Sequence, residues 1–144
     1  MKKVLVILSL AVLVVGMTSC CRPCRKAKPQ EIKGTRWGLM ELNDKVIDRN
    51  AGERPDRLTL ILGEEGRISG KGDCNGFFAA YSLTGDRISI SNIGSTRMLC
   101  PDQPLENEYF QTLEKAVQIK IDGDFLLLMD KEGKIIVSFR KLNE

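Results

Sequence analysis

Short apolar segments separated by tight turns make up most of the sequence from Gly34 onward. Asp122-Gly123-Asp124 and Lys131-Glu132-Gly133 each divide two such segments, and glycine-containing turns of this length are typical of β-hairpins. Strands joined by turns this short pair antiparallel, so the sequence predicts a mainly antiparallel sheet. The predicted strands are residues 35–42, 58–62, 67–72, 77–83, 87–91, 118–121, 125–129 and 135–140.

One segment departs from this pattern and predicts a helix. Asp102 can cap its start and Pro104 suits its first turn. Apolar residues follow at spacings that place them on one helical face: Leu105, Tyr109, Leu113, Ala116 and Val117. We therefore expect an α+β fold, in which about eight strands form a strongly curved, barrel-like sheet with one helix packed on it.

The first twenty residues are organised like the leader of a bacterial lipoprotein. Lys2 and Lys3 precede an apolar run, residues 4–15, that is too short to span a membrane. Small residues then lead directly into Cys20, which resembles a lipobox and implies lipidation of this cysteine. We expect residues 1–19 to be a signal peptide; the rival interpretation is an ordinary secretory signal cleaved nearby.

Residues 20–33 are predicted to carry the lipid and then form a basic tether. Cys21, not aspartate, follows Cys20, and by resemblance to lipoprotein sorting this favours the outer membrane, facing the periplasm. The predicted partners are the membrane, through the lipid anchor, and an envelope protein; no oligomeric state is indicated. Cys21 and Cys24 form a C-x-x-C pair, which we interpret as a local disulfide or a bridge between chains.

Two features of the composition weigh against whole classes of function. The net charge of +3 includes Lys2 and Lys3 of the leader, so the domain is nearly neutral and lacks the basic field that nucleic-acid binding needs. The chain also has no histidine, which removes Ser-His-Asp and Cys-His catalysis and histidine-containing zinc sites. We expect no enzyme, no metal and no cofactor.

Two strings carry a family resemblance: Gly72-Asp73-Cys74-Asn75 and Thr96-Arg97-Met98-Leu99-Cys100-Pro101. Together with the opening Thr35-Arg36-Trp37 and the hairpin at residues 130–134, they make residues 34–142 similar to the META domain, also called HslJ-like. Asp73 stands where a glycine is common. The resemblance implies a small envelope or secreted domain, in some cases linked to heat shock, drug tolerance or motility, with no established reaction and no cofactor.

Cys74 and Cys100 are the two cysteines inside this predicted domain. In an oxidising compartment they are expected to form a disulfide. A reactive thiol pair and two buried, inert cysteines are the alternatives, and the lack of histidine to activate a thiolate weighs against the first.

The residues beside these cysteines are candidates for binding loops: Asp73, Asn75, Thr96 and Arg97. Arg97 could anchor an anionic ligand, or it could pair with Asp73 or Asp102 and fix the loops. The acidic residues of the predicted helix are expected on its solvated surface: Glu106, Glu108 and Glu114. The aromatic residues of the strands are expected in the core: Trp37, Phe77, Phe78, Tyr81 and Phe125.

These features lead to three functional hypotheses. The first is a non-catalytic envelope lipoprotein domain that binds a protein or supports the envelope under stress, and such a domain should expose an apolar patch. The alternative is a small-ligand carrier that uses the barrel interior, which a completely filled interior would exclude. The third is an enzyme that depends on a thiol or a carboxylate.

Overall fold

The computed structural model describes residues 32–48, 57–98 and 103–143. Within them it contains nine strands, one α-helix and one short 3-10 turn. In chain order these are β1 (Arg36–Leu42), β2 (Lys45–Val46), β3 (Thr59–Leu62), η1 (Glu64–Gly66), β4 (Arg67–Lys71), β5 (Gly76–Thr84), β6 (Arg87–Ser95), α2 (Gln103–Glu114), β7 (Gln118–Asp122), β8 (Phe125–Met129) and β9 (Ile135–Lys141).

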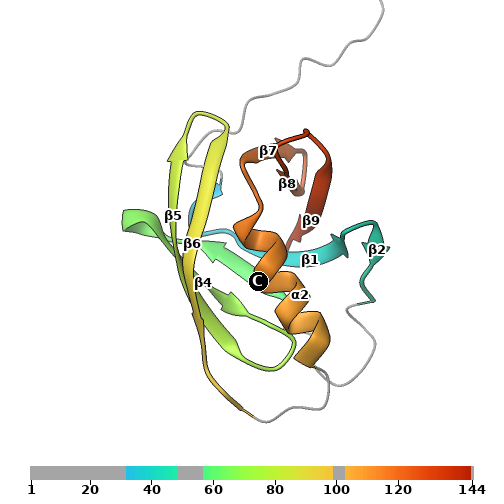
Figure 1. Ribbon diagram of the computed structural model, residues 1–144. Helices are drawn as coiled ribbons and strands as arrows, with labels where there is room; N and C mark the ends of the chain where they lie inside the picture. The colour runs from blue at the N-terminus through green and yellow to red at the C-terminus, as the bar shows by residue number, and fades with distance from the viewer. Residues whose placement is uncertain (1–31, 49–56, 99–102, 144) are drawn as a thin grey trace, which may run out of the picture.

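The strands form one antiparallel sheet that closes on itself (Figure 1). Neighbours follow the order β2-β1-β3-β4-β5-β6-β7-β8-β9, and β1 also pairs with β9. This last pairing places Trp37 opposite Lys141 and Leu39 opposite Phe139. The prediction of a mostly antiparallel, strongly curved sheet with one helix is confirmed.

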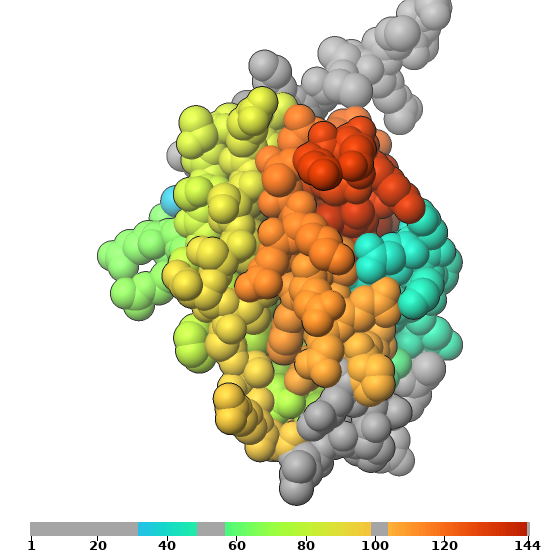
Figure 2. Space-filling view, viewed as in Figure 1, coloured from blue at the N-terminus to red at the C-terminus, as the bar shows by residue number. Residues whose placement is uncertain are grey.

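The ring is weakest where β6 meets β7. These strands share one residue pair, Arg87 with Gln118, and backbone hydrogen bonds on either side of it. The helix α2 connects the two strands and lies across the open part of the ring (Figure 1). Its side chains fill the space between those of β6 and β9 in the space-filling view (Figure 2). The helix therefore covers strand edges that would otherwise be open to other chains.

The interior of the ring is a packed apolar core. Tyr109 and Leu113 of α2 are completely buried in it. The Tyr109 ring centroid lies 5.8 Å from that of Phe77 and 6.2 Å from that of Phe139, both in edge-to-face arrangements. Burial raises the pKa of Tyr109 well above its ordinary value, and its hydroxyl donates to the Thr59 carbonyl at 3.4 Å.

The expected aromatic core is confirmed for three residues and wrong for two. Trp37, Phe77 and Tyr81 are buried, whereas Phe78 is 65% exposed and Phe125 is 41% exposed. Successive side chains of a strand point to opposite faces, so Phe77 and Phe78 of β5 could not both point inward. Phe78 consequently stands on the outer face of the sheet.

The described fold begins with two residues that the sequence analysis assigned to the tether. Ile32 is completely buried, and its carbonyl accepts a hydrogen bond from Trp37 Nε1 at 3.4 Å. Lys33 forms a parallel bridge with Leu62 and an ion pair with Glu64 at 2.7 Å. The chain is therefore fixed to the β3–η1 end of the ring from Ile32 onward.

The predicted signal peptide, the lipidation site Cys20 and most of the tether lie outside the described residues. Within the described ranges, no helix has the length and apolar character needed to cross a membrane.

Candidate functional site

The two strings that carry the family resemblance meet at one end of the ring. The first forms the connection between β4 and β5, where the Gly72 amide donates to the Asn75 carbonyl at 2.7 Å. The second begins where β6 ends, and the Thr96 amide donates to the Gly76 carbonyl at 3.0 Å. The first turn of α2 reaches the same place through Glu106. We call this set of contacts the Asn75–Glu106 network.

Glu106 is the centre of the network. Its Oε2 accepts hydrogen bonds from the backbone amides of Cys74 at 3.0 Å and Asn75 at 2.8 Å, and its Oε1 accepts one from Asn75 Nδ2 at 2.7 Å. The residue is only 5% exposed. A buried carboxylate requires such donors, because without them its loss of water would cost several kcal/mol. Gly72 allows the approach, since a Cβ at that position would clash with the Glu106 carboxylate.

Asn75 extends the network to the third segment. Its Oδ1 accepts hydrogen bonds from Thr96 Oγ1 at 2.9 Å and from the Met98 amide at 2.8 Å. The orientation of the amide is fixed by these partners, because rotating it would place its oxygen against the Glu106 carboxylate. One buried side chain thus joins the β4–β5 connection, the segment after β6 and helix α2. Asn75 and Thr96, two of the predicted binding-loop residues, are in this way brought together.

Asp73 pairs with a residue that the sequence analysis did not consider. Arg57 Nη1 lies 2.9 Å from Asp73 Oδ1, and both side chains are largely buried. Arg57 Nη2 also donates to the Asp48 carbonyl at 3.0 Å, which ties the β4–β5 connection to the segment before β3. Of the two carboxylates considered as partners of Arg97, Asp73 is thus paired with Arg57.

Arg97 is exposed at the edge of the network. No ion pair joins it to another residue in the described ranges, and its other predicted partner, Asp102, lies outside them. Cys74 lies in the network through its amide. Cys100 lies outside the described residues, so the disulfide remains a prediction.

The expectation that Glu106 lies on the solvated surface is wrong. Sequence spacing contained a usable signal, because Glu106 precedes Tyr109 by three residues and Leu113 by seven, which places all three on one helical face. Arg57 gave no such signal, since its contact with Asp73 depends on the pairing of β3 with β4.

Glu108 makes a second, more exposed contact between α2 and the sheet. Its Oε1 accepts a hydrogen bond from Asn43 Nδ2 at 3.0 Å, and Lys45 Nζ lies 3.2 Å from its Oε2. The hydrogen bond from Asn43, followed by that from Lys45, lowers the pKa of Glu108 below its ordinary value of 4.5. Asn43 Nδ2 also donates to Thr112 Oγ1 at 3.0 Å, so the helix is held to the β1–β2 turn at two points.

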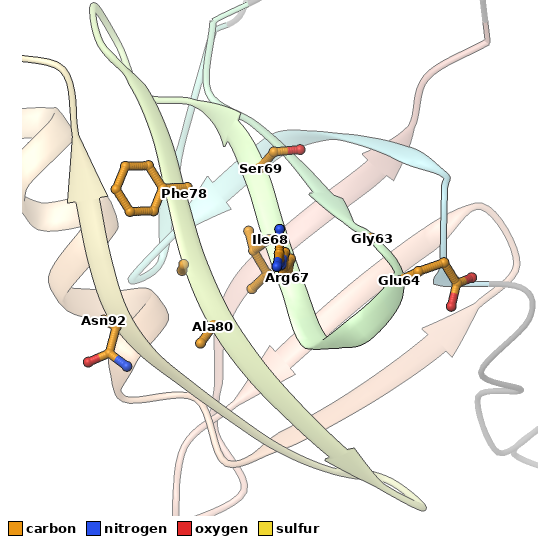
Figure 3. A pocket seen from close by; sticks show the side chains of 9 residues that line it. Gly63, Glu64, Arg67, Ile68, Ser69, Phe78, Ala80 and Asn92 are labelled. Carbon is orange, nitrogen blue, oxygen red and sulfur yellow. The ribbon is translucent and has the colours of Figure 1, made fainter.

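A second candidate site, the outer pocket, lies on the outer face of β4, β5 and β6 (Figure 3). Its volume is about 650 Å³. It is lined by η1, by the residue before η1 and by the three strands. The lining side chains include Glu64, Arg67, Ser69, Phe78, Ala80 and Asn92. No motif in the sequence pointed to this face.

The described residues contain no cluster of three or more histidine, cysteine, aspartate or glutamate side chains arranged to hold a metal ion. The Asn75–Glu106 network has its carboxylate oxygens directed at backbone and amide donors. What this arrangement does chemically is to fix three chain segments relative to one another.

Comparison with known proteins identifies a family. The family model described as META domain matches residues 30–143, and none of the curated proteins compared matches the chain. An NMR structure of a protein from Burkholderia xenovorans is 22% identical, with a TM-score of 0.63 over 80% of this chain and 86% of that one. A crystal structure of a DUF4847 family protein from Bacteroides vulgatus is 14% identical, with a TM-score of 0.60 over 80% of this chain and 97% of that one. At these identities the likeness shows a shared fold alone.

Proposed function

Because this chain belongs to the META domain family, we propose that it is a non-catalytic domain of the bacterial envelope that acts by binding other envelope components. It is held at the membrane by a lipid on Cys20, on the periplasmic side of the outer membrane. The leader sequence supports this address, and the family resemblance agrees with it.

The proposal rests on one observation: the carboxylate of the Asn75–Glu106 network is bonded to the chain itself. A catalytic carboxylate must reach a substrate, whereas Glu106 is 5% exposed and both its oxygens already accept hydrogen bonds from the chain. Asn75 and Thr96, from the strings that carry the family resemblance, are thus engaged in holding the fold, which argues for a scaffold that presents its surface to a partner.

The surface offers apolar side chains for such contacts. Phe78 is 65% exposed on the outer face of the sheet, and Met98 is 55% exposed beside the Asn75–Glu106 network. Aromatic residues and methionine are enriched where proteins bind partners. The carrier alternative is weakened by the interior of the ring, where the described inward-pointing side chains pack against one another.

Two neighbouring cysteines allow a matched test of the anchor. Cells that produce the full chain are labelled with a fatty-acid analogue, and a double variant, Cys20→Ala with Cys21→Ala, is compared with Cys21→Ala alone. The double variant is needed because Cys20→Ala by itself would place small residues directly before Cys21. We expect the double variant to lose both the label and membrane attachment, while Cys21→Ala keeps both. Loss of the label in Cys21→Ala alone would show that the anchor has been placed on the wrong residue.

Binding is tested by cross-linking the lipidated protein in its native membrane and identifying what is captured by mass spectrometry. A reproducible envelope component supports the proposal, and its loss in Arg97→Glu would locate the contact beside the Asn75–Glu106 network. If the native membrane yields no reproducible component, the binding role is wrong.

A further inference from the structure

Phe78 lies flat on the sheet with one face of its ring open. Gly94 is its cross-strand neighbour on β6. A Cβ built on Gly94 would lie 2.5 Å, 2.8 Å and 3.1 Å from three carbons at the end of the Phe78 ring, Cζ, Cε2 and Cε1. Three such similar distances arise when the ring lies over the glycine with its face and not its edge. The ring therefore covers Gly94, a known way in which an aromatic residue stabilises a glycine in a sheet, and its other face is available at 65% exposure.

Two polar side chains, Ser69 and Asn92, line the outer pocket together with Phe78. Ser69 is the neighbour of Phe78 on β4, and Figure 3 shows it on the side of β5 opposite to Asn92. Asn92 has φ +55° and lies where the β5–β6 register shifts between Phe78 and Ala80. Bulges of this kind are found next to binding sites, because they redirect a side chain. The floor between these groups is formed by small residues such as Ala80.

One cationic side chain completes the outer pocket. The Arg67 side chain is 80% exposed, and its contact with Glu65, at 3.9 Å, is weak because both groups are in solvent. Glu64, at the far end of the pocket, is neutralised by Lys33 at 2.7 Å. The guanidinium of Arg67 is thus free to bind a carboxylate from a ligand.

We propose that the outer pocket binds a glycan whose sugar rings carry N-acetyl groups and substituents that end in carboxylates, which is the chemistry of peptidoglycan. The apolar face of a sugar ring stacks on Phe78, its hydroxyl and N-acetyl groups bind Ser69 and Asn92, and a carboxylate binds Arg67. The volume of about 650 Å³ lies within the range of roughly 300–1,000 Å³ typical of small-ligand sites. The choice of peptidoglycan rests on the proposed envelope address.

The shape of the pocket favours a sugar over a protein side chain. Protein hot spots are well-packed pockets that surround an inserted anchor and exclude water. Here the aromatic ring lies on an open sheet face whose other lining side chains include a serine and an asparagine. This arrangement suits a ligand that presents an apolar C–H face and carries hydroxyl groups at its edges.

The test is co-sedimentation of the full-length protein, in mild detergent, with purified peptidoglycan sacculi. Phe78→Ala should bind about tenfold more weakly, because the stacking surface is lost. Phe125→Ala is the matched control, since it removes an exposed aromatic side chain from another strand, β8, and it should bind like the unaltered protein. Unchanged melting temperatures in both variants would show that any loss reflects binding and not unfolding.

Soluble fragments separate the role of Arg67 from that of Phe78. Arg67→Gln should weaken binding of a muramic-acid-containing disaccharide about threefold, as expected for an exposed ion pair. The same variant should bind chitotriose, which is neutral, as the unaltered protein does, whereas Phe78→Ala should bind both ligands more weakly.

Three results would overturn the inference: no sedimentation of the unaltered protein, Phe78→Ala binding as well as Phe125→Ala, or capture of a protein through Phe78 in place of the glycan. Each leaves the lipid anchor on Cys20 untouched, because that is measured by labelling. Conversely, loss of the anchor without loss of sacculus binding would overturn the proposed address alone.

Discussion

The Asn75–Glu106 network and the outer pocket use polar side chains in opposite ways. In the network, Asn75 and Glu106 are almost completely buried, and the polar atoms of both side chains bond to the chain itself. In the outer pocket, Arg67 and Phe78 are mostly exposed. The network includes residues of the two strings that carry the family resemblance, and the pocket coincides with no motif noted in the sequence.

If the outer pocket binds the proposed glycan, the strings that carry the family resemblance are not the place where this protein acts. Buried polar groups tolerate little change, because each must keep its partners. A signature built from such groups records what the fold requires. Surface groups that meet a ligand leave a weaker trace in a single sequence, and here only the structure points to them.

The largest effect is expected from removing the carboxylate at the centre of the network. Glu106→Ala leaves two backbone amides and the Asn75 amide without their acceptor. Because an unsatisfied buried donor costs about 1–3 kcal/mol, we expect the free energy of unfolding to fall by about 3–5 kcal/mol. Urea unfolding followed through the fluorescence of Trp37, the single tryptophan, measures this loss. Glu114→Ala, at an exposed position of the same helix, should cost little. Equal losses in the two variants would mean that the network does not hold the fold.

A somewhat smaller loss is expected when Asn75 is shortened. Asn75→Ala removes the hydrogen bonds to Thr96, Met98 and the Glu106 Oε1 atom but keeps the backbone amide bonds to Glu106, so we expect a loss of about 2–3 kcal/mol. Asn92→Ala is the corresponding change in the outer pocket. Because Asn92 has a positive φ of 55°, which alanine tolerates less well than asparagine, it should cost about 1 kcal/mol while weakening sacculus binding. If Asn92→Ala destabilises the protein more than Asn75→Ala does, the assignment of a structural role to the network and of a binding role to the pocket is wrong.

The same glycine-to-alanine change should have different consequences in the two regions. In Gly72→Ala the new Cβ meets a carboxylate held by hydrogen bonds, so we expect a loss of about 1–2 kcal/mol. In Gly94→Ala it meets only the end of the Phe78 ring, which can turn into solvent, so stability should change by less than about 1 kcal/mol. Because the displaced ring no longer lies flat, Gly94→Ala should still bind sacculi more weakly. Melting curves and co-sedimentation of both variants separate these outcomes.

The smallest effect is expected at Glu108, whose exposure is intermediate between that of the buried network residues and that of the exposed pocket residues. Its pKa is lowered in the folded protein, so its ionised form stabilises the fold above the ordinary pKa of 4.5, and this contribution is lost as the pH falls through the folded-state pKa. Its side chain is 32% exposed, so we expect Glu108→Gln to cost less than about 1 kcal/mol near pH 7. Unfolding curves of both proteins should differ at pH 7 and converge below pH 4.5. A difference that grows on acidification would contradict the assigned hydrogen bonds.

Most of the fold could be predicted because its signals are local. Turns such as Asp122-Gly123-Asp124 specify hairpins, and Gly123 does adopt a positive φ of 60°. The main error in the helix came from treating Glu106 as polar and therefore external, although its spacing from Tyr109 matched the buried face. The short strand β2 was missed because its two residues, Lys45 and Val46, are exposed and have no hydrophobic alternation.

The contacts within the sites could be predicted only in part. The strings containing Asn75 and Thr96 drew attention because they lie beside the cysteines, but Arg57 and Glu106 reach this region from distant parts of the chain. Phe78 was placed in the core because aromatic residues usually lie there, and its neighbour Phe77 occupies the inward position instead. These contacts and the outward orientation of Phe78 depend on long-range strand pairing and on which face of the sheet each side chain occupies, and composition alone does not determine either.

The pairing of β1 with β9 has a consequence for the order in which the molecule is completed. The first and last long strands of the described fold are neighbours. During synthesis, β1 can therefore pair with β9 only after the residues near the C-terminus have been added to the chain. Until then the incomplete chain presents open strand edges on β1 and β8, the kind of surface on which other chains assemble. A truncation of the last seven to ten residues should therefore expose an edge of β1, near the start of the fold, and we expect the truncated chain to aggregate before it folds.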